Sequence, residues 1–277
     1  MRLEKYRDIH EFSGDTLEIL LENEAQNNLP VSFIYNKTAD SSDWFMASVK
    51  DSNGGIALVA VCTPPFNIVL YETRNEPDDQ AVALLAAELR SMGLAVPGVL
   101  ALQGLASRFA AAYANGRAEA HMSMVVMELD RVNEPGRAPG RCRLLREDDI
   151  FFVPYWERAF SEDCRVEVFD IPTNVERVKR RIGKGVHYIW EDVCPVAQAV
   201  HGRSTKCGAV VNGVYTPPHF RNRGYASSVV AELSGELIKR GNRFCCLFAD
   251  ASNPVSRGMY NKIGYRDVCV YDEIRFI

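Results

Sequence analysis

The stretch Val210–Ala226 reads V-V-N-G-V-Y-T-P-P-H-F-R-N-R-G-Y-A, and it decides the fold that the sequence predicts. Its first part, Val210–Thr216, is rich in β-branched and aromatic residues, which favours a strand. Pro217–Pro218 ends that strand because proline has no N–H to donate to a neighbour. After Gly224, apolar residues recur at helical spacing. The sequence therefore predicts a strand, a short loop and an amphipathic helix in that order.

This order of elements favours the binding of an anion. The first N–H groups of a helix have no partner within the helix, and the positive end of the helix dipole lies beside them. Gly224 and Ala226 are small, so an anion can approach the backbone. Arg221 and Arg223 add two positive charges. We therefore expect a phosphate group to bind here; the alternative is a tight turn whose arginines face solvent.

The motif Arg221-x-x-Gly224-x-Ala226 resembles the acetyl-CoA loop of the GNAT acyltransferase superfamily, Gln/Arg-x-x-Gly-x-Gly/Ala. The preceding sequence V-Y-T-P-P resembles the sequence found at this position in one branch of the GNAT superfamily. The resemblance implies that the pantetheine arm of acetyl-CoA lies along Val214, Tyr215 and Thr216. It also implies that the pyrophosphate binds at Arg221, Asn222, Arg223, Gly224, Tyr225, Ala226 and Ser227.

A second segment strengthens the resemblance. Pro254 is favoured at the first position of a helix, which makes Asn253 the N-cap. Asn253, Ser256 and Tyr260 are spaced so that they lie on one helix face. The GNAT resemblance implies that Asn253 and Ser256 contact acetyl-CoA and that Tyr260 also protonates the departing thiolate. The alternative for Tyr260 is an aromatic side chain that merely packs at a helix edge.

The composition is that of a globular protein. The 277 residues are 47% hydrophobic and 25% charged, with a formal net charge of −4, so neither nucleic acid nor an anionic membrane is an expected partner. No apolar run approaches the roughly 18 residues of a membrane span, and the N-terminus has no apolar signal core. The eight scattered cysteines predict reduced thiols in the cytoplasm and no metal site.

A Pro- and Gly-rich segment, Glu134–Gly140, predicts a linker between domains 1–134 and 141–277. We expect strands in the first half at Trp44–Lys50, Ile56–Cys62, Phe66–Glu72, Val99–Leu102 and Ala120–Asp130, with helices at Asp15–Asn28, Asp78–Met92 and Gly104–Asn115. In the second half we expect strands at Arg141–Arg146, Val186–Glu191, Val196–His201, Cys207–Thr216, Phe244–Ala249 and Tyr265–Phe276, with helices at 148–160, Asn174–Ile182, 226–240 and Pro254–Ile263.

The two halves have nearly the same order of elements. The second resembles the GNAT fold, an α+β fold with a mixed sheet, and the first half resembles it by pattern alone. At the matching position the first half has Thr73–Asp79, which carries three acidic residues and no Gly-x-Gly/Ala. A pyrophosphate would be repelled there, so we expect a divergent GNAT-like domain that lacks the acyl-CoA loop. An unrelated α+β domain is the alternative.

The sequence leaves the general base open. Asn212 stands on the strand where many GNAT enzymes carry a carboxylate, and an amide cannot accept the proton. The alternatives are a water chain or one of the residues Glu191, Asp192, Asp250, His187, His201 and His219. The aromatic residues Phe151, Phe152, Tyr155, Trp156 and Trp190 could line a substrate pocket, although such residues are more often core.

We therefore expect a cytoplasmic N-acetyltransferase that uses acetyl-CoA as cosubstrate, needs no metal and acylates a primary amine of a small molecule or peptide. The oxyanion would be bound by the backbone N–H of Val214 or Tyr215. A homodimer is an open option. The rival hypothesis, favoured by Asn212, is an acyl-CoA-binding sensor or scaffold without catalytic activity.

Overall fold

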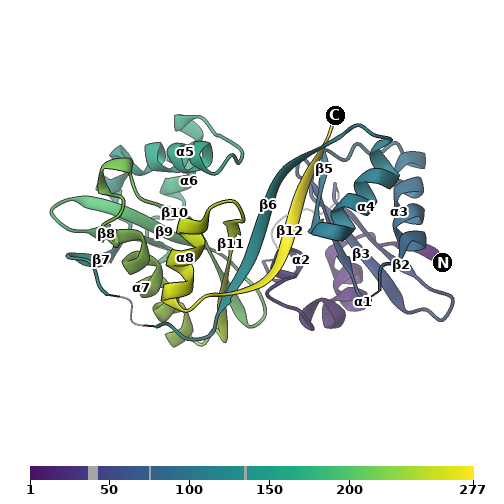
Figure 1. Cartoon of the computed structure of the whole chain (residues 1–277), viewed down its shortest axis with the longest axis horizontal. Coiled ribbons are helices and arrows are strands. Elements are labelled where there is room, and N and C mark those ends of the chain that lie inside the picture. The colour runs from purple at the N-terminus through teal and green to yellow at the C-terminus, as the bar shows by residue number, and fades with distance from the viewer. Residues whose placement is uncertain (37–42, 75, 134–135) are drawn as a thin grey trace. The chain divides into compact units, whose positions relative to one another are not determined.

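A computed structural model describes residues 1–36, 43–74, 76–133 and 136–277, and all statements about structure refer to these residues. The chain forms two compact units (Figure 1). The first comprises Met1–Val126, Ala249–Ser252 and Asp267–Ile277, and the second comprises Met127–Phe248 and Asn253–Arg266. The boundary predicted at Glu134–Gly140 stays a prediction, and Glu134 and Pro135 lie outside the described residues.

The first unit is a mixed sheet with helices on both faces. Its elements are β1 (Arg2–Lys5), α1 (Ile9–Leu21), α2 (Asn28–Tyr35), β2 (Phe45–Lys50), β3 (Ile56–Cys62), β4 (Ile68–Glu72), α3 (Asp79–Ser91), β5 (Gly98–Leu102), α4 (Gln103–Ala114), β6 (Ala118–Leu129) and β12 (Arg266–Phe276). The strand order is β1-β2-β3-β4-β5-β12-β6. One hydrophobic core packs α3 and α4 on the sheet, and another packs α1 and α2 on its opposite face.

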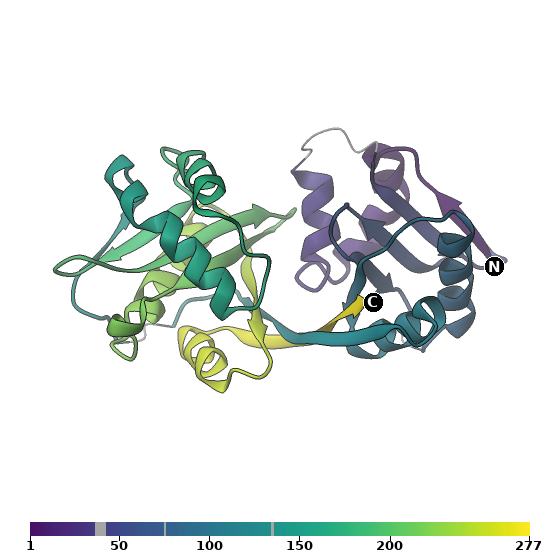
Figure 2. The ribbon, with the colours of Figure 1, turned by 90° about the horizontal axis from the view of Figure 1, so that it is seen from above.

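The last strand of the chain completes the sheet of the first unit. β12 pairs antiparallel with β5, from Tyr271 opposite Leu102 to Arg275 opposite Gly98. On its other side it runs beside β6, where Ser123 Oγ donates to Asp272 Oδ1 at 2.6 Å (Figure 1, Figure 2). The sequence predicted this strand but not the partner strands with which it pairs.

The second unit is built around a five-strand order, β11-β10-β9-β8-β7. Its elements are β7 (Arg141–Leu144), η1 (Glu147–Phe151), α5 (Val153–Asp163), α6 (Ile171–Lys179), β8 (His187–Glu191), β9 (Pro195–Ser204), β10 (Gly208–Tyr215), η2 (Pro218–Phe220), α7 (Tyr225–Lys239), β11 (Phe244–Asp250) and α8 (Pro254–Ile263). The helices α5 and α6 cover one face of this sheet, and α7 and α8 lie on the other (Figure 1).

Several boundaries differ from the sequence-based expectation. The strand β1 and the helix α2 were not predicted. The helix α6 begins at Ile171, earlier than expected, because Asp170 is its N-cap and accepts a hydrogen bond from Thr173 N at 2.8 Å. A short apolar or charged run shows little periodicity. Whether it forms a helix or a strand therefore depends on the residues that pair with it or cap it.

The described part of the predicted linker is ordered against the second unit. Trp190 Nε1 donates to the Pro139 carbonyl at 2.8 Å, and Ala138 N donates to Ser228 Oγ at 2.9 Å. Gly140 has φ +103°, and a Cβ there would lie 2.3 Å from the Glu191 carbonyl oxygen, so only glycine fits. Residues 137–140 therefore behave as part of the second unit.

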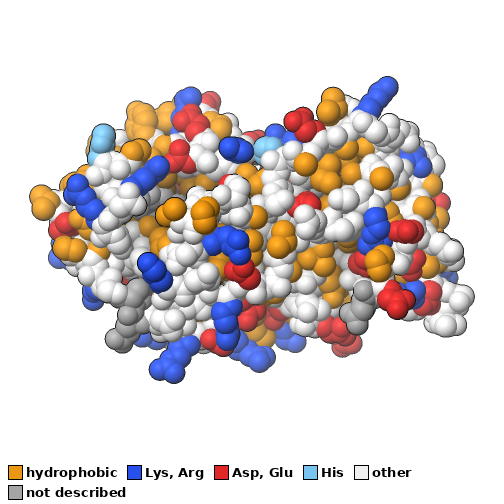
Figure 3. Space-filling view, viewed as in Figure 1, with side chains coloured by type: hydrophobic (Ala, Val, Ile, Leu, Met, Phe, Trp, Pro, Cys, Tyr) orange, Lys and Arg blue, Asp and Glu red, His pale blue; other side chains and the backbone are white. Residues whose placement is uncertain are grey.

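Charges of both signs are interspersed over the face shown in Figure 3, in keeping with the small net charge. All eight cysteines are free thiols. Across the described ranges, no group of His, Cys, Asp and Glu side chains is arranged to hold a metal ion. The same ranges contain no helix with the length and apolar character needed to cross a bilayer.

Candidate acyl-CoA site

The strand β10 separates from its neighbour β11 halfway along its length. The two strands pair in parallel at Gly208, Ala209 and Val210, and no pair is recorded in the described residues beyond Val210. The rest of β10 therefore offers a strand edge on this side. Such an edge carries free N–H and C=O groups that an extended ligand can contact.

A β-bulge lies in the same part of β10. Asn212 pairs with Val200 and Tyr215 pairs with Gln198 on β9, so Gly213 and Val214 together stand opposite a single residue. Gly213 has φ +58°, a conformation that glycine adopts without strain. A bulge leaves one residue out of the ladder, so it exposes backbone polar groups near Val214, where the sequence leads us to expect an oxyanion.

The helix α7 begins with unpaired N–H groups. Its N-cap, Gly224, has φ +80°, and no side chain in the described ranges caps the helix. The first hydrogen bond of the helix runs from Ser228 N to the Gly224 carbonyl at 3.0 Å. Within the described structure, the backbone N–H groups of residues 222–227 donate to no other group. Free N–H groups and the positive end of a helix dipole are the features that favour an anion at a helix start.

Two hydrogen bonds fix the start of α7 on the unit. The buried Tyr225 hydroxyl donates to Asp192 Oδ2 at 2.7 Å, and this bond raises the pKa of the tyrosine. Ser228 Oγ accepts from Ala138 N on the other side. The side chain of Tyr225 is therefore occupied, and only its backbone N–H remains for a ligand.

The two loop arginines differ in their contacts. Arg221 lies over the Tyr215 ring, donates through Nε to the Thr216 carbonyl at 3.0 Å, and forms an ion pair with Asp163 at 2.6 Å. Arg223 is exposed. Because the Arg221–Asp163 pair lies on the surface, it costs little to break.

One polar atom beside the loop lacks a partner. Thr216 Oγ1 is buried and makes no hydrogen bond with any described residue. A buried hydroxyl is costly without a partner, which suits a position where a bound ligand supplies one. Together with the free N–H groups of residues 222–227, it fits the polar groups of coenzyme A.

The helix α8 carries the other predicted residues. Asn253 is its N-cap, as predicted, and its Oδ1 accepts from Ser256 N at 3.1 Å, while Ser256 Oγ donates to the Asn253 carbonyl at 3.1 Å. The carboxamide nitrogen of Asn253 forms no hydrogen bond with the described residues. Asn253 therefore has a donor left for a ligand, whereas the hydroxyl proton of Ser256 is used locally.

Tyr260 lies buried at the inner side of α8 and packs edge-on against Tyr265, with ring centroids 5.8 Å apart. Burial raises the pKa of Tyr260 well above its ordinary range, and the Cys164 thiol adds to the rise. The hydroxyl is therefore protonated at neutral pH and can donate a hydrogen bond. Cys164 follows Asp163, the partner of Arg221, so α8 and the loop both approach the end of α5.

The strand carboxylates considered as general base are engaged elsewhere. Glu191 forms ion pairs with Arg143 and Arg141, which hold the pKa of its carboxyl below the usual range. Asp192 accepts from Tyr225, and Asp250 accepts from Ser252 N at 2.8 Å. None of these three carboxylates is left without a partner.

The candidate histidines lie in different surroundings. His187 is fully buried, and burial lowers its pKa to about 4. Burial also lowers the pKa of His201, whose Nε2 lies 3.1 Å from Ser204 Oγ. His219 is exposed in η2.

The aromatic residues divide into core and surface. Trp190 is buried in the second unit. Phe152 and Trp156 pack edge-on at 4.7 Å and contact the core, and Trp156 lies 6.2 Å from Tyr215. Phe151 and Tyr155 are exposed. Only Trp156 approaches the candidate site.

A group of polar residues that the sequence did not single out lies beside the bulge. Glu157 on α5 is buried, and its Oε1 accepts from Gln198 Nε2 at 3.1 Å and pairs with Arg181 at 2.9 Å. Gln198 also donates to the Gly213 carbonyl at 3.3 Å. The one sequence signal was position: Glu157 follows buried Val153 by one helical turn, on the face toward the sheet.

The corresponding helix start in the first unit is built differently. Asp78 caps α3 by accepting from Ala81 N at 3.1 Å, and Asp78 N itself donates to Glu72 Oε1 at 2.7 Å. Arg74 pairs with Asp78, and Arg108 pairs with Glu72. Carboxylates therefore occupy the place where a phosphate would bind. Asn75 lies outside the described residues.

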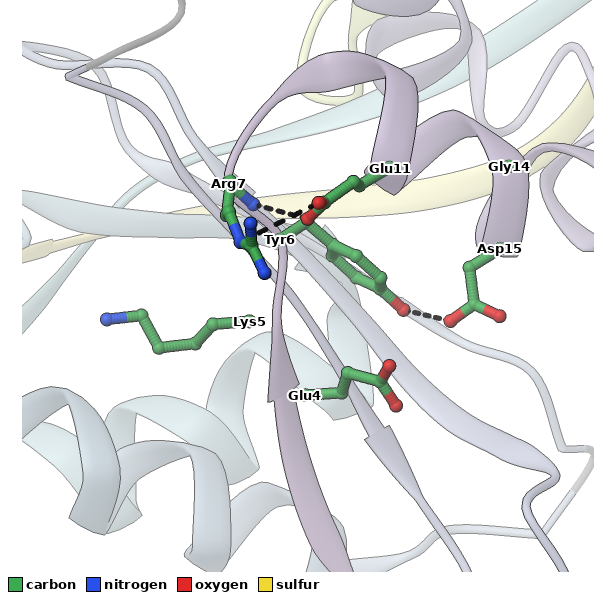
Figure 4. A pocket seen from close by; sticks show the side chains of 7 residues that line it. All are labelled: Glu4, Lys5, Tyr6, Arg7, Glu11, Gly14 and Asp15. Carbon is green, nitrogen blue, oxygen red and sulfur yellow. Dashed lines mark hydrogen bonds and ion pairs between the residues drawn. The ribbon is translucent and has the colours of Figure 1, made fainter.

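A charged pocket of the first unit lies between β1 and α1 (Figure 4). Its lining residues are Glu4, Lys5, Tyr6, Arg7, Glu11, Gly14 and Asp15. The Tyr6 hydroxyl donates to Asp15, and buried Lys50 pairs with both Asp15 and Glu4. Most charges of this pocket are thus paired, whereas Lys5 Nζ contacts the Met92 sulfur at 3.2 Å. None of the lining residues was predicted as a site residue.

Comparisons with known proteins agree with this architecture. Residues 195–274 match the family model described as FR47-like protein, which is related to GNAT. No curated protein matches the sequence. The stretch that matches the family model contains β9, β10, the loop, α7, β11 and α8.

Solved structures with the same fold span the whole chain. A GCN5-related N-acetyltransferase from Sphaerobacter thermophilus has a TM-score of 0.67 at 14% identity and covers 99% of this chain and 95% of its own. A GNAT-family acetyltransferase from Colwellia psychrerythraea has a TM-score of 0.63 at 9% identity and covers 100% of both chains. A tandem GNAT protein from the clavulanic acid biosynthesis pathway has a TM-score of 0.57 at 13% identity and covers 98% of both.

The chain thus has the mixed α/β fold of GNAT acetyltransferases, and a tandem GNAT protein is among the structures that share it. The expected fold class and the resemblance to GNAT proteins are confirmed at this level.

Proposed function

We propose that the second unit is an N-acetyltransferase, which transfers an acetyl group from acetyl-CoA directly to a primary amine. The observation that carries this proposal is the start of α7, where the N–H groups of residues 222–227 make no bond within the described structure. The equivalent start of α3 is capped by a carboxylate, so this feature is particular to the second unit.

The proposed roles follow from the positions of the residues. The N–H groups of residues 222–227 would bind the pyrophosphate, with Arg221 and Arg223 beside it. Val214–Thr216 would bind the pantetheine arm along the open edge of β10. Holding the thioester beside the amine can supply roughly 7–11 kcal/mol of the barrier.

Two groups would act on charge that develops during transfer. The N–H of Val214 would bind the tetrahedral oxyanion, a contact that is worth roughly 3–4 kcal/mol in comparable sites. Tyr260 would donate to the departing thiolate from α8. Its raised pKa keeps the proton on the hydroxyl until the sulfur carries charge.

The experiment is a screen of primary amines with acetyl-CoA and the full chain. Amino sugars, polyamines, amino acids and peptides would be tested, with released coenzyme A measured by chromatography, because exposed Cys194 would react with thiol reagents. Tyr260→Phe should bind acetyl-CoA and lose most of its turnover. Tyr265→Phe is a matched control, since its hydroxyl is 2.8 Å from Ser234 Oγ and serves packing.

A second candidate function is an acyl-CoA-binding sensor without catalysis. It is favoured by Asn212 and by the engagement of Glu191 and Asp192 with other side chains. The two functions differ in one outcome. A sensor binds acetyl-CoA but releases no coenzyme A with any amine, and Tyr260→Phe then has no turnover to lose.

A further inference from the structure

The carboxylate that β10 lacks at Asn212 has a counterpart on the facing helix. Glu157 lies in the middle of α5, which packs on β10. A Cβ placed on Gly213, the bulge residue, would lie 4.0 Å from Glu157 Oε1. The carboxylate is therefore beside the point where β10 opens from β11 and where the thioester would be held.

The two oxygens of this carboxylate have different surroundings. Both partners of Glu157, Gln198 Nε2 and Arg181, contact Oε1. Oε2 forms no hydrogen bond or ion pair with any described residue. Unpaired polar atoms that are fully buried do not include Oε2, so this oxygen is partly exposed to solvent. The whole Glu157 side chain is 10% exposed. One oxygen is thus anchored and the other is open to accept a proton.

A chain of buried groups fixes the orientation of this carboxylate. Gln198 uses its NH₂ group for Glu157 Oε1 and the Gly213 carbonyl, so its own oxygen must face His187 Nε2, 3.3 Å away. His187 then carries its proton on Nε2. With its pKa at about 4, it remains neutral over the pH range of an assay. Gln198 is therefore a positioning residue for Glu157.

The geometry points to Glu157 as the general base of the proposed transfer, an inference that rests on the proposed function. The attacking nitrogen forms a bond to the thioester carbon, and Glu157 Oε2 accepts the proton that this nitrogen loses. The C–S bond then breaks and the thiolate takes a proton from Tyr260. The nucleophile is the neutral amine; Tyr260 regains a proton from solvent and Glu157 releases one to solvent, so an amine and a thioester give an amide and a thiol.

The alternative is that Glu157 only stabilises the unit by neutralising Arg181. Burying the two charges together would then be its whole function. The two roles predict different results for a variant that preserves shape and hydrogen bonding but cannot accept a proton. Glu157→Gln is that variant, because its amide oxygen can still accept from Gln198 and lie beside Arg181, whose Nη1 makes an ion contact with Glu157 but no aligned hydrogen bond.

The test measures acetyl transfer to the best amine of the screen for four proteins. They are the wild type, Glu157→Gln, Glu157→Asp and the matched control Glu162→Gln, which changes an exposed glutamate of the same helix. Glu157→Gln should lower the turnover roughly 100-fold or more, as removal of a general base does. Acetyl-CoA affinity should change by no more than about twofold, since the base touches the amine and not the coenzyme.

The stability and the turnover of the variants separate catalysis from structure. A purely structural role would lower the free energy of unfolding of Glu157→Gln and leave the turnover of the folded protein unchanged, whereas a general base is needed for the turnover itself. Glu157→Asp should retain part of the turnover, and Glu162→Gln should match the wild type.

Three outcomes would overturn the inference. If Glu157→Gln turns over within about threefold of wild type while Tyr260→Phe is impaired, the base is wrong and the transferase stands. If the wild type binds acetyl-CoA and acylates no amine, the transferase and its base both fail. If Glu157→Gln does not fold, Glu157→Asp decides, and a turnover equal to that of the wild type contradicts the assignment.

Discussion

Replacing Gly224 by alanine directly tests the proposed pyrophosphate site at the N–H groups of residues 222–227. Gly224 holds φ at +80° as the N-cap of α7, between the unpaired N–H groups and Ala138. A Cβ at this position would lie 3.7 Å from the Ala138 Cβ, which is an ordinary contact, so the substitution brings no clash inside the protein. Its effects are limited to backbone strain and to the space in front of the N–H groups.

The two effects have separate magnitudes. The left-handed conformation costs an alanine about 1–2 kcal/mol in the free energy of unfolding. Losing one charge-assisted hydrogen bond to a phosphate costs about 1.5–3 kcal/mol. The second loss corresponds to a dissociation constant for acetyl-CoA that rises about tenfold or more.

A matched control exists at the other end of the same helix. Gly241 follows α7 with φ +100°, and a Cβ there would meet no atom within 4 Å. Gly241→Ala should therefore lose similar stability in urea unfolding and keep its affinity for acetyl-CoA in calorimetry. The reasoning is refuted if Gly224→Ala binds acetyl-CoA as tightly as Gly241→Ala does.

Three further predictions concern the charges around the site and the fold. Asp163→Asn should raise the affinity for acetyl-CoA by up to about fivefold in calorimetry, because Arg221 then has no surface ion pair to break; unchanged affinity would place Arg221 outside the site. Asp78→Ala should lower the free energy of unfolding by about 0.5–2 kcal/mol through loss of a helix cap, without adding a second binding event for acetyl-CoA; a change in stoichiometry would contradict this. Between pH 7 and pH 5 the unfolded chain binds a proton at His187 that the folded protein, with its lowered pKa of about 4, does not bind, so wild-type stability should fall by about 2 kcal/mol from this source. His187→Gln should lack that part of the loss and His219→Gln should retain it, and equal slopes for all three proteins would show that His187 does not titrate as described.

The sequence predicted the strand, loop and helix at 210–240 because the signals there are local. Proline ends a strand, glycine and alanine leave room at a helix start, and an apolar stripe marks a helix over residues 225–239. Asn253 was likewise predicted as an N-cap from the proline that follows it. These signals depend on neighbours within a few residues, so they can be followed without a structure.

Long-range pairing could not be predicted in the same way. β12 pairs with β5, more than 160 residues earlier in the chain, and its alternating pattern would fit several partners. β1 has only four residues, and it is a strand because β2 pairs with it. Glu157 looked like one more surface glutamate of an amphipathic helix, because Arg181 and Gln198 adjoin it only in the folded unit.

Hydrogen exchange of the full chain with and without acetyl-CoA measures the central claim most directly. The N–H groups of residues 222–227 have no partner in the described structure, so they should exchange fast in the free protein. Acetyl-CoA should slow their exchange, while peptides at the start of α3, around Ala81, should be unaffected. Exchange at 222–227 that stays unchanged at a saturating concentration of acetyl-CoA would contradict the account.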